Sequence, residues 1–392
     1  MRKKLTRPAV PTIVGTGLVT LDIVIDGLNR RCFAAGGTCA NVMIALSYLG
    51  WKSILVSRLG IDSASDIVLD DLETFGVDTT FAKLKPQAST PVIVQRITVD
   101  SHGDPYHTFS FSCPSCGRRL PSYQPVPGSV VREMVSQIKE SATVVFVDRI
   151  SRGSIDLASS ISDLGGIVVF EPSSIRDEKL FREMLDICHV IKYSHECLLD
   201  DGDLHWSPNT VLEIQTLGRG GVRHRYRDGR GHRTIWHHSD ALPVPKLVDT
   251  CGAGDWFSAG LIHRLCRQGK ESFSEMGMAE INRTVAFAQR LSSWNCGYIG
   301  ARGGMYSDRG RAALRSIARL QNYTEAPKPK PGRDSAAAQI CGCNYRNCDS
   351  NIRHTQDFTE LSSNADNRIK QERMNCPSNG RVLLPSKTGH LN

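Results

Sequence analysis

The residues with the clearest capacity for chemistry lie together at 249–260, which read Asp-Thr-Cys-Gly-Ala-Gly-Asp-Trp-Phe-Ser-Ala-Gly. A helix that begins here directs its first unpaired N–H groups outward. Gly252, Ala253 and Gly254 have almost no side chain to keep an anion away from those groups. Asp255 then places a carboxylate at the mouth of this anion hole. There it can take the proton from a hydroxyl group that attacks a phosphoryl group.

A purely structural interpretation of this stretch stays open on its own residues. Glycines often precede helices, and the helix dipole alone favours an aspartate in the first turn. A short motif therefore needs a context before it indicates a phosphate site.

The context is a second glycine-rich stretch at 36–50, which reads Gly-Gly-Thr-Cys-Ala-Asn-Val-Met-Ile-Ala-Leu-Ser-Tyr-Leu-Gly. Apolar residues recur at helical spacing from 42 to 49, and Gly50 is a typical stop. Gly36 and Gly37 permit a ligand to approach the backbone closely. Asn41 falls in the first turn of the predicted helix, where its amide can face the same ligand.

Together the two motifs resemble those of the ribokinase-like sugar kinases, also called phosphofructokinase-B-type carbohydrate kinases. Residues 249–255 match the family's Asp-Thr-x-Gly-Ala-Gly-Asp signature in full. Residues 36–50 resemble its Gly-Gly-x-x-x-Asn-x-Ala-x-x-Leu-x-x-Leu-Gly signature, with Met43 where alanine is usual. The resemblance covers residues 12–305.

The resemblance implies ATP-dependent phosphorylation of a hydroxyl group on a small sugar or sugar-like substrate. Asp255 then corresponds to the general base, and residues 252–254 to the anion hole for the transferring γ-phosphate. The residues that correspond to the family's sugar pocket are Asp22, Gly36, Gly37 and Asn41.

The resemblance also implies an ATP site with Mg²⁺ bridging the phosphates. Residues 216–221, Thr-Leu-Gly-Arg-Gly-Gly, are similar to the family's Thr-x-Gly-x-x-Gly turn. The residues expected at the nucleotide are Thr216, Gly218, Gly221, Gln289 and Glu196. Asp249 stands where many members hold a monovalent cation. One departure concerns magnesium: the family's Asn-x-x-Glu is replaced by Ser194 and Cys197, with Glu196 one residue early.

The predicted fold class is α/β, a three-layer αβα sandwich with a mostly parallel central sheet and a small β-lid. Apolar, β-rich runs at 143–147, 166–170 and 190–193 alternate with helical stretches. In the family the lid, here parts of 14–37 and 90–120, excludes water from the reaction. We expect a kinase domain over 1–320. A Pro/Lys linker and a largely disordered, cysteine-containing tail would occupy 321–392.

Composition limits the partners. The 392 residues are 40% hydrophobic and carry a formal charge of +8, without a basic stripe interleaved with aromatic residues. We therefore expect a small-molecule sugar and ATP as ligands, and no nucleic acid.

No apolar run is long enough to span a membrane. The basic start lacks an apolar segment and 13 cysteines are scattered, so a cytoplasmic location is expected.

Cys113-Pro-Ser-Cys116-Gly is a motif that the resemblance does not explain. It has the shape of a zinc knuckle, but supplies two of the four ligands that structural Zn²⁺ takes. The others would come from the tail (Cys341, Cys343 and Cys348) or from a homodimer through the lid. The alternatives are two ordinary thiols or a redox pair.

Two rival functions stay open, and one cysteine is a candidate reactive group. The same sugar pocket would serve a nucleoside kinase of the family. A non-catalytic protein that keeps the fold for binding or scaffolding is the rival from another class. Cys251, at the helix entrance, is expected to have a lowered pKa, so that alkylation would impair turnover.

Overall fold

The chain is described here by a computed structural model that covers residues 10–27, 31–99, 105–138, 142–197, 204 and 206–319. The strands of the main sheet are β1 (Thr12–Thr16), β4 (Lys52–Gly60), β5 (Asp78–Lys85), β8 (Val144–Val147), β9 (Ile167–Phe170), β10 (Val190–Ser194), β11 (Leu212–Thr216), β12 (Val222–Tyr226) and β13 (His237–Ser239). A second sheet contains β2 (Thr20–Ile25), β3 (Arg31–Gly36), β6 (Val92–Val99) and β7 (Pro105–Ser110). The helices are α1 (Thr38–Tyr48), α2 (Ser63–Thr74), α3 (Gly128–Ile138), α4 (Arg152–Asp163), α5 (Glu178–Ile187), α6 (Ala253–Leu265), α7 (Lys270–Ser274), α8 (Met278–Asn295) and α9 (Asp308–Ala318).

The main sheet has nine strands in the order β13-β12-β11-β10-β9-β8-β1-β4-β5. Every neighbouring pair from β11 to β5 is parallel, whereas β12 and β13 add an antiparallel edge. Short β-rich runs alternating with helices favour such a sheet because each helix returns the chain to the same edge. The predicted α/β fold with a mostly parallel sheet is confirmed.

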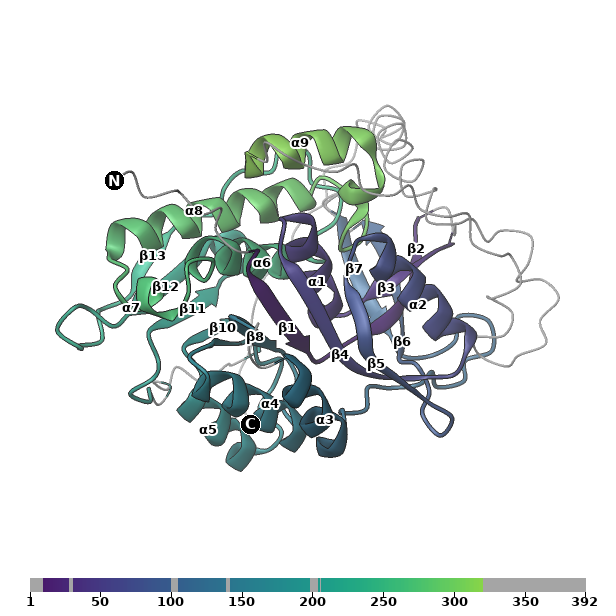
Figure 1. The fold of residues 1–392 in the computed structure, drawn as a ribbon. Helices are drawn as coiled ribbons and strands as arrows, with labels where there is room; N and C mark the ends of the chain where they lie inside the picture. The colour runs from purple at the N-terminus through teal and green to yellow at the C-terminus, as the bar shows by residue number, and fades with distance from the viewer. Residues whose placement is uncertain are drawn as a thin grey trace, which may run out of the picture.

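Helices cover both faces of this sheet (Figure 1). One face carries α1, α6, α8 and α9, and their apolar side chains form one core with the sheet. The other face carries α3, α4 and α5 over a separate core. The continuous apolar strands agree with burial on both sides; all four residues of β8 and of β9 are buried.

The four-stranded lid sheet, β3-β2-β6-β7, lies beside the main sheet, with α2 packed between them. All four strands fall within residues 14–37 and 90–120, the two segments in which the sequence predicts the lid. Residues 12–26 contain two strands, because the chain leaves the main sheet after β1 and enters the lid as β2. The change occurs at Gly17, whose φ is +151° and where an added Cβ would lie 1.6 Å from Asp148 Oδ1. Only glycine fits this approach.

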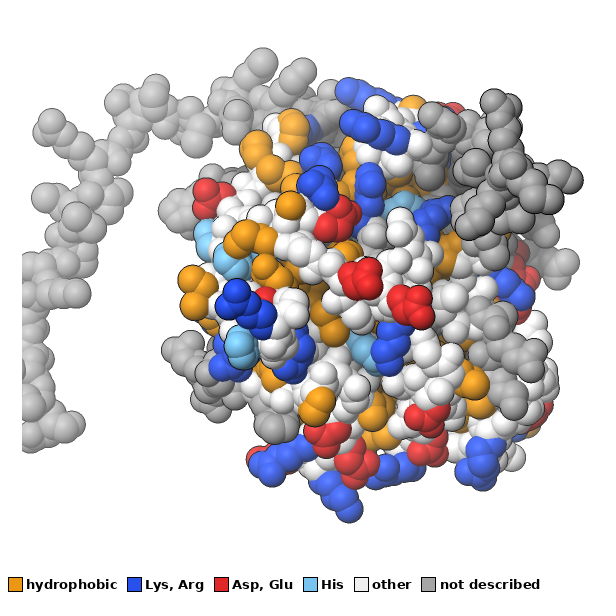
Figure 2. Space-filling model, turned by 60° about the vertical axis from the view of Figure 1, so that its left-hand side comes forward, with side chains coloured by type: hydrophobic (Ala, Val, Ile, Leu, Met, Phe, Trp, Pro, Cys, Tyr) orange, Lys and Arg blue, Asp and Glu red, His pale blue; other side chains and the backbone are white. Residues whose placement is uncertain are grey.

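The surface and the remaining segments add little to the position of the site. On the face drawn in Figure 2, Lys and Arg side chains are spread among Asp and Glu. Within the described ranges, no helix has the length and apolar character to cross a bilayer. The linker and tail expected at 321–392, with Cys341, Cys343 and Cys348, lie outside the described residues.

Candidate functional site

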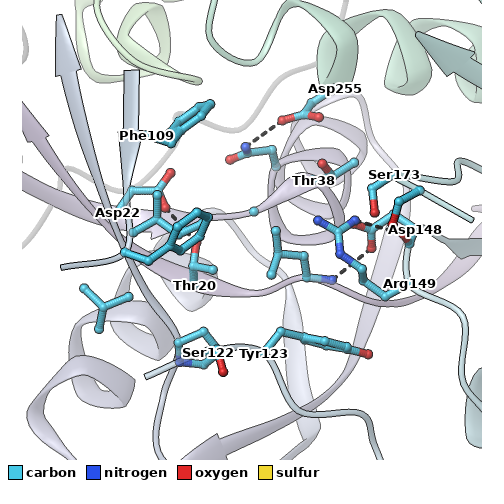
Figure 3. Close-up of a pocket in the computed structure, with 18 of the residues that line it drawn as sticks. Thr20, Asp22, Thr38, Phe109, Ser122, Tyr123, Asp148, Arg149, Ser173 and Asp255 are labelled. Atoms are coloured by element: carbon cyan, nitrogen blue, oxygen red, sulfur yellow. Dashed lines mark hydrogen bonds and ion pairs between the residues drawn. The ribbon is translucent and has the colours of Figure 1, made fainter. Parts of the chain in front are cut away.

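A cavity of about 830 Å³ lies between the lid and the carboxyl edge of the main sheet (Figure 3). The lid contributes side chains from β2, β6 and β7, and the main domain contributes the loops after β8 and β9. The first turns of α1 and α6 close it. The carboxyl edge of a parallel sheet is where α/β proteins commonly bind ligands, because the loops that follow the strands meet there.

Asp255 lies in the first turn of α6 and lines this cavity. The helix begins after Gly252, whose φ is +74°; a Cβ there would lie 2.5 Å from the backbone of Ala301. Glycine is therefore required at the entrance. Burial, with a smaller contribution from Glu171, raises the pKa of Asp255 to about 7. The carboxyl group is thus poised to exchange a proton near neutral pH.

Asn41 links the two glycine-rich motifs. Its Nδ2 donates to Asp255 Oδ2 at 2.7 Å, so α1 and α6 bring residues 214 positions apart into contact. Its Oδ1 accepts from Arg302 Nε at 2.9 Å. Because a guanidinium group can only donate, this contact fixes which end of the amide faces Asp255.

Asp22 reaches the cavity from the lid strand β2 (Figure 3). Thr20 Oγ1 donates to its Oδ1 at 2.6 Å, and burial raises the pKa of Asp22 to about 6. Gly36 lies in the paired strand, where a Cβ would lie 2.0 Å from the carboxyl group of Asp22. Gly37 lines the cavity and starts α1 with a φ of +85°. Three residues of the expected sugar pocket, Asp22, Gly37 and Asn41, therefore line one opening, and Gly36 lies against Asp22 without lining it.

Arg302 is not marked by any sequence motif, but it donates to Asn41 from outside the cavity lining. Arg302 Nη2 is 2.8 Å from Asp71 Oδ2 and also donates to the carbonyl of Ala35, and both charged side chains are almost completely buried. Tyr306 Oη donates to Asp71 as well. No local motif marks these residues, since their importance comes from contacts across 231 positions or more.

A second missed group lies at the α6 entrance. Lys192, on β10, forms a buried ion pair with Glu171, which follows β9. Lys192 Nζ also donates to the carbonyl of Gly254 at 3.2 Å, and Ser258 Oγ donates to Glu171 Oε2 at 2.5 Å. β9 and β10 are neighbours, so sheet order is the signal that could have found the pair.

Asp148 and Arg149 are a third missed group, at the end of β8. Asp148 accepts from the backbone N–H of Leu18 at 2.9 Å and from Arg149 Nη1 at 2.8 Å. Burial raises the pKa of Asp148 to about 6. This carboxyl group holds the turn where the chain enters the lid.

The residues expected at the nucleotide lie at the same sheet edge but not in the cavity lining. Ser194 and Thr216 are in register at the ends of β10 and β11, and the backbone N–H of His195 donates to the carbonyl of Thr216 at 3.0 Å. Glu196 is exposed just beyond them, and Gly218 and Gly221 bound the turn at 218–220. Gln289, on α8, uses its Nε2 to donate to the carbonyl of Asp240 at 2.8 Å.

Asp249 does not offer the expected cation site. Its Oδ1 lies 3.0 Å from both the backbone N of Cys251 and the Nδ1 of His107. Its Oδ2 accepts from Gln95 Nε2 at 2.7 Å and from the backbone N–H of Gly300 at 2.9 Å. These four contacts use the lone pairs that a monovalent cation would need. The structure instead uses Asp249 to join lid strands β6 and β7 to the α6 entrance.

The expected reactivity of Cys251 is wrong. Its side chain is buried, and burial together with the neighbouring carboxylates of Asp249, Asp22 and Asp255 raises its pKa well above the usual value. A helix N-terminus can lower the pKa of a cysteine, but at Cys251 burial and the nearby carboxylates outweigh that effect.

Cys113 and Cys116 lie in a loop that follows β7, with Cys113 buried and Cys116 exposed. Within the described part of the chain, no group of three or more His, Cys, Asp or Glu side chains is arranged to hold a metal ion. The zinc interpretation therefore receives no support from the neighbours of this pair.

Comparisons with known proteins agree on one family. Residues 27–109 match the model of the pfkB family carbohydrate kinases. The chain is 29% identical to a fructokinase of Klebsiella pneumoniae, over 64% of this chain and 84% of that protein. It is 24% identical to an aminoimidazole riboside kinase of Salmonella typhimurium, over 64% and 80% respectively.

Solved structures show the same fold. A fructokinase with bound ATP from Xylella fastidiosa superposes with a TM-score of 0.60 at 19% identity, covering 79% of this chain and 99% of that one. A Burkholderia thailandensis nucleoside kinase in complex with inosine gives 0.54 at 18% identity, covering 81% and 99%.

Proposed function

We propose that the chain is a member of the ribokinase-like, PfkB-type carbohydrate kinases and that it transfers the γ-phosphoryl group of ATP to a hydroxyl group of a small sugar or sugar-like acceptor. One observation carries the proposal: Asp255, Asn41 and Asp22 face a single cavity at the entrance of α6. A proton acceptor, hydroxyl-binding groups and a helix N-terminus then meet where phosphoryl transfer needs them.

In this mechanism Asp22 and Asn41 hold the acceptor so that one hydroxyl group faces Asp255. Asp255 takes the hydroxyl proton as the oxygen attacks the γ-phosphorus. The N–H groups at Gly252 and Gly254 stabilise negative charge on the transferring group, whereas the expected donor at Ala253 is already bonded to the carbonyl of Thr250 at 3.2 Å. Lys192, paired with Glu171, lies beside them at the carbonyl of Gly254. Closure of the lid would exclude the water that would otherwise hydrolyse ATP.

ATP would lie along the carboxyl edge of the sheet, on the turn that contains Thr216, Gly218 and Gly221, with Gln289 near the base. Mg²⁺ usually binds through substrate phosphates and one or two carboxylates. Glu196 follows β10 at this edge and is exposed, so it would hold such an ion, whereas both oxygens of Glu171 are already bonded to Lys192 and Ser258. Bound there, Mg²⁺ would neutralise charge on the phosphates.

A nucleoside or other glycoside is a second candidate acceptor, and the cavity's aromatic wall favours it. Phe109, Phe111 and Tyr123 line the cavity, and Phe109 and Phe111 are 50% and 55% exposed. A flat base could stack on such rings.

A screen for ADP release with Mg²⁺-ATP against sugars and nucleosides tests the proposal and separates the two acceptor classes. We expect turnover with one class. ATP binding without turnover on any acceptor would favour the non-catalytic rival.

The pH dependence reports on the proposed base. Because Asp255 must be ionised to accept a proton and its pKa is raised to about 7, we expect kcat/KM to rise with pH and level off above pH 7. The measurement is kcat/KM for the acceptor from pH 5 to 9. A profile that is flat across pH 7 would count against Asp255 as the base.

The acceptor pocket makes a separate prediction for Asp22→Asn. Loss of the charged acceptor for hydroxyl donors should raise KM for the acceptor by roughly 10-fold or more and leave KM for ATP unchanged. Asp70→Asn, on the exposed side of α2, is the matched control and should alter neither constant. Equal effects on both substrates would contradict a role specific to the acceptor.

A further inference from the structure

The lid contains a cysteine pair that the proposed phosphoryl transfer does not use. Cys113 and Cys116 are separated by Pro114 and Ser115, and the Cys113 side chain is close enough to Cys116 to contribute to the lowering of its pKa. Backbone hydrogen bonds close the loop, from Gly117 N–H to the Cys113 carbonyl at 2.9 Å and from Cys113 N–H to the Arg118 carbonyl at 2.8 Å. The loop thus holds the two sulfurs together before any bond forms between them.

The two thiols differ as an attacking and a resolving thiol must differ. Cys116 is exposed, whereas Cys113 is 7% exposed and belongs to the apolar core that the lid strands share with the main sheet. Hydrogen bonds from the backbone and side chain of Arg118 lower the pKa of Cys116. Burial raises the pKa of six other described cysteines, which are Cys39, Cys188, Cys197, Cys251, Cys266 and Cys296. Cys116 therefore combines access with thiolate character, which is what thiol–disulfide exchange selects.

We propose that Cys113 and Cys116 are a redox site that forms a reversible disulfide by exchange with a disulfide-bearing molecule. The Cys116 thiolate attacks a sulfur of that molecule, whose disulfide bond breaks and releases one thiolate. Cys113 loses its proton and attacks the mixed disulfide at Cys116, and the second thiolate leaves. The pair loses two electrons and two protons, and the partner disulfide is reduced to two thiols.

The position of the loop connects this site to the cavity. Phe111 and Arg119 flank the loop and line the cavity, and Ser112 and Arg119 form a β-bridge at its base. Oxidation removes the thiolate that Arg118, the neighbour of Arg119, stabilises. We therefore expect acceptor binding to weaken in the oxidised protein.

Peptide mapping of the full chain tests the redox site directly. The protein is equilibrated in buffers of reduced and oxidised glutathione, quenched, alkylated and digested with trypsin. Residues 97–118 form one tryptic peptide whose only cysteines are this pair. We expect this peptide to lose two hydrogens on oxidation and to regain them with dithiothreitol.

Single substitutions separate the roles of the two sulfurs. Cys113→Ser should trap glutathione on Cys116, and Cys116→Ser should leave the peptide without either modification. Cys197→Ser, at a half-buried thiol elsewhere, should form the lid disulfide like the unaltered protein. A peptide that stays reduced throughout, or zinc in the purified protein that Cys113→Ser releases, would overturn the proposal.

The link to the cavity has its own readout, which rests on the proposed function. KM for the acceptor should rise by about fivefold in the oxidised protein, with KM for ATP unchanged. Identical acceptor KM values in the two states would overturn the link. Because the mapping needs no turnover, failure of the kinase assignment would leave the redox result readable.

Discussion

Replacement of Asp255 by asparagine is expected to lower kcat by about 10²–10⁴-fold while ATP binding survives. Asparagine keeps the size of the side chain and an oxygen that can accept from Asn41 Nδ2, but it cannot take a proton from the acceptor. The measurements are steady-state turnover with the acceptor found by the screen and ATP affinity by titration. Turnover close to that of the unaltered enzyme would exclude Asp255 as the base.

Stability provides the control for this substitution. The pKa of Asp255 is raised to about 7 in the folded chain, so the folded state disfavours the ionised carboxylate. The resulting loss of folding stability is absent below about pH 4, the pKa of an aspartate in the unfolded chain. It is complete above about pH 7. Asp255→Asn should therefore be more stable than the unaltered protein at pH 8, by on the order of 1–3 kcal/mol, with the difference vanishing near pH 4. An inactive variant that is less stable at pH 8 would point to misfolding.

Lys192 and Glu171 act in opposite directions on the ionisation of the Asp255 carboxyl group. The negative charge of Glu171 raises the pKa of Asp255, and the positive charge of Lys192 lowers it. Because these two effects oppose each other, the pKa of Asp255 stays near 7. Lys192 meanwhile donates to the carbonyl of Gly254. Burial and the two opposing charges together give a carboxyl group whose pKa suits proton transfer near neutral pH.

The parts of the site that could be predicted from the sequence are those in which local backbone geometry demands a residue type. Position 252, with a φ of +74°, and position 36, against the Asp22 carboxyl group, both require glycine. Each of these glycines can be recognised in the sequence and indicates where the site residues beside it lie. The parallel sheet was predictable for a similar reason, since short apolar runs alternate with helices.

Arg302, Lys192 and Asp148 could not be found this way. Each is a single charged residue without a local motif, and its role arises from contacts that only the folded chain creates. The errors have the same origin. Asp249 and Cys251 were assigned by position in a motif, whereas hydrogen bonds saturate the first and burial with nearby carboxylates suppresses the ionisation of the second.

Arg302→Met is expected to destabilise the chain by roughly 3–5 kcal/mol, because it leaves Asp71 buried with its counter-charge removed. It should also reduce kcat/KM for the acceptor, since Asn41 loses the donor that orients its amide toward Asp255. Denaturant unfolding and steady-state kinetics give the two readouts. Arg283→Met is the matched control, because that arginine is 69% exposed and pairs with Glu280 on the surface of α8. It should change stability by no more than about 1 kcal/mol.

The double variant Arg302→Met with Asp71→Asn separates stability from positioning. A neutral amide at 71 removes the stranded charge and keeps an oxygen for the donors Tyr306 Oη and the backbone N–H of Ala35, so much of the lost stability should return. Acceptor kcat/KM should stay low, because Asn41 still lacks its donor. If activity returned together with stability, Arg302 would act through folding alone, whereas stability regained without activity identifies it as the residue that positions Asn41 against the base.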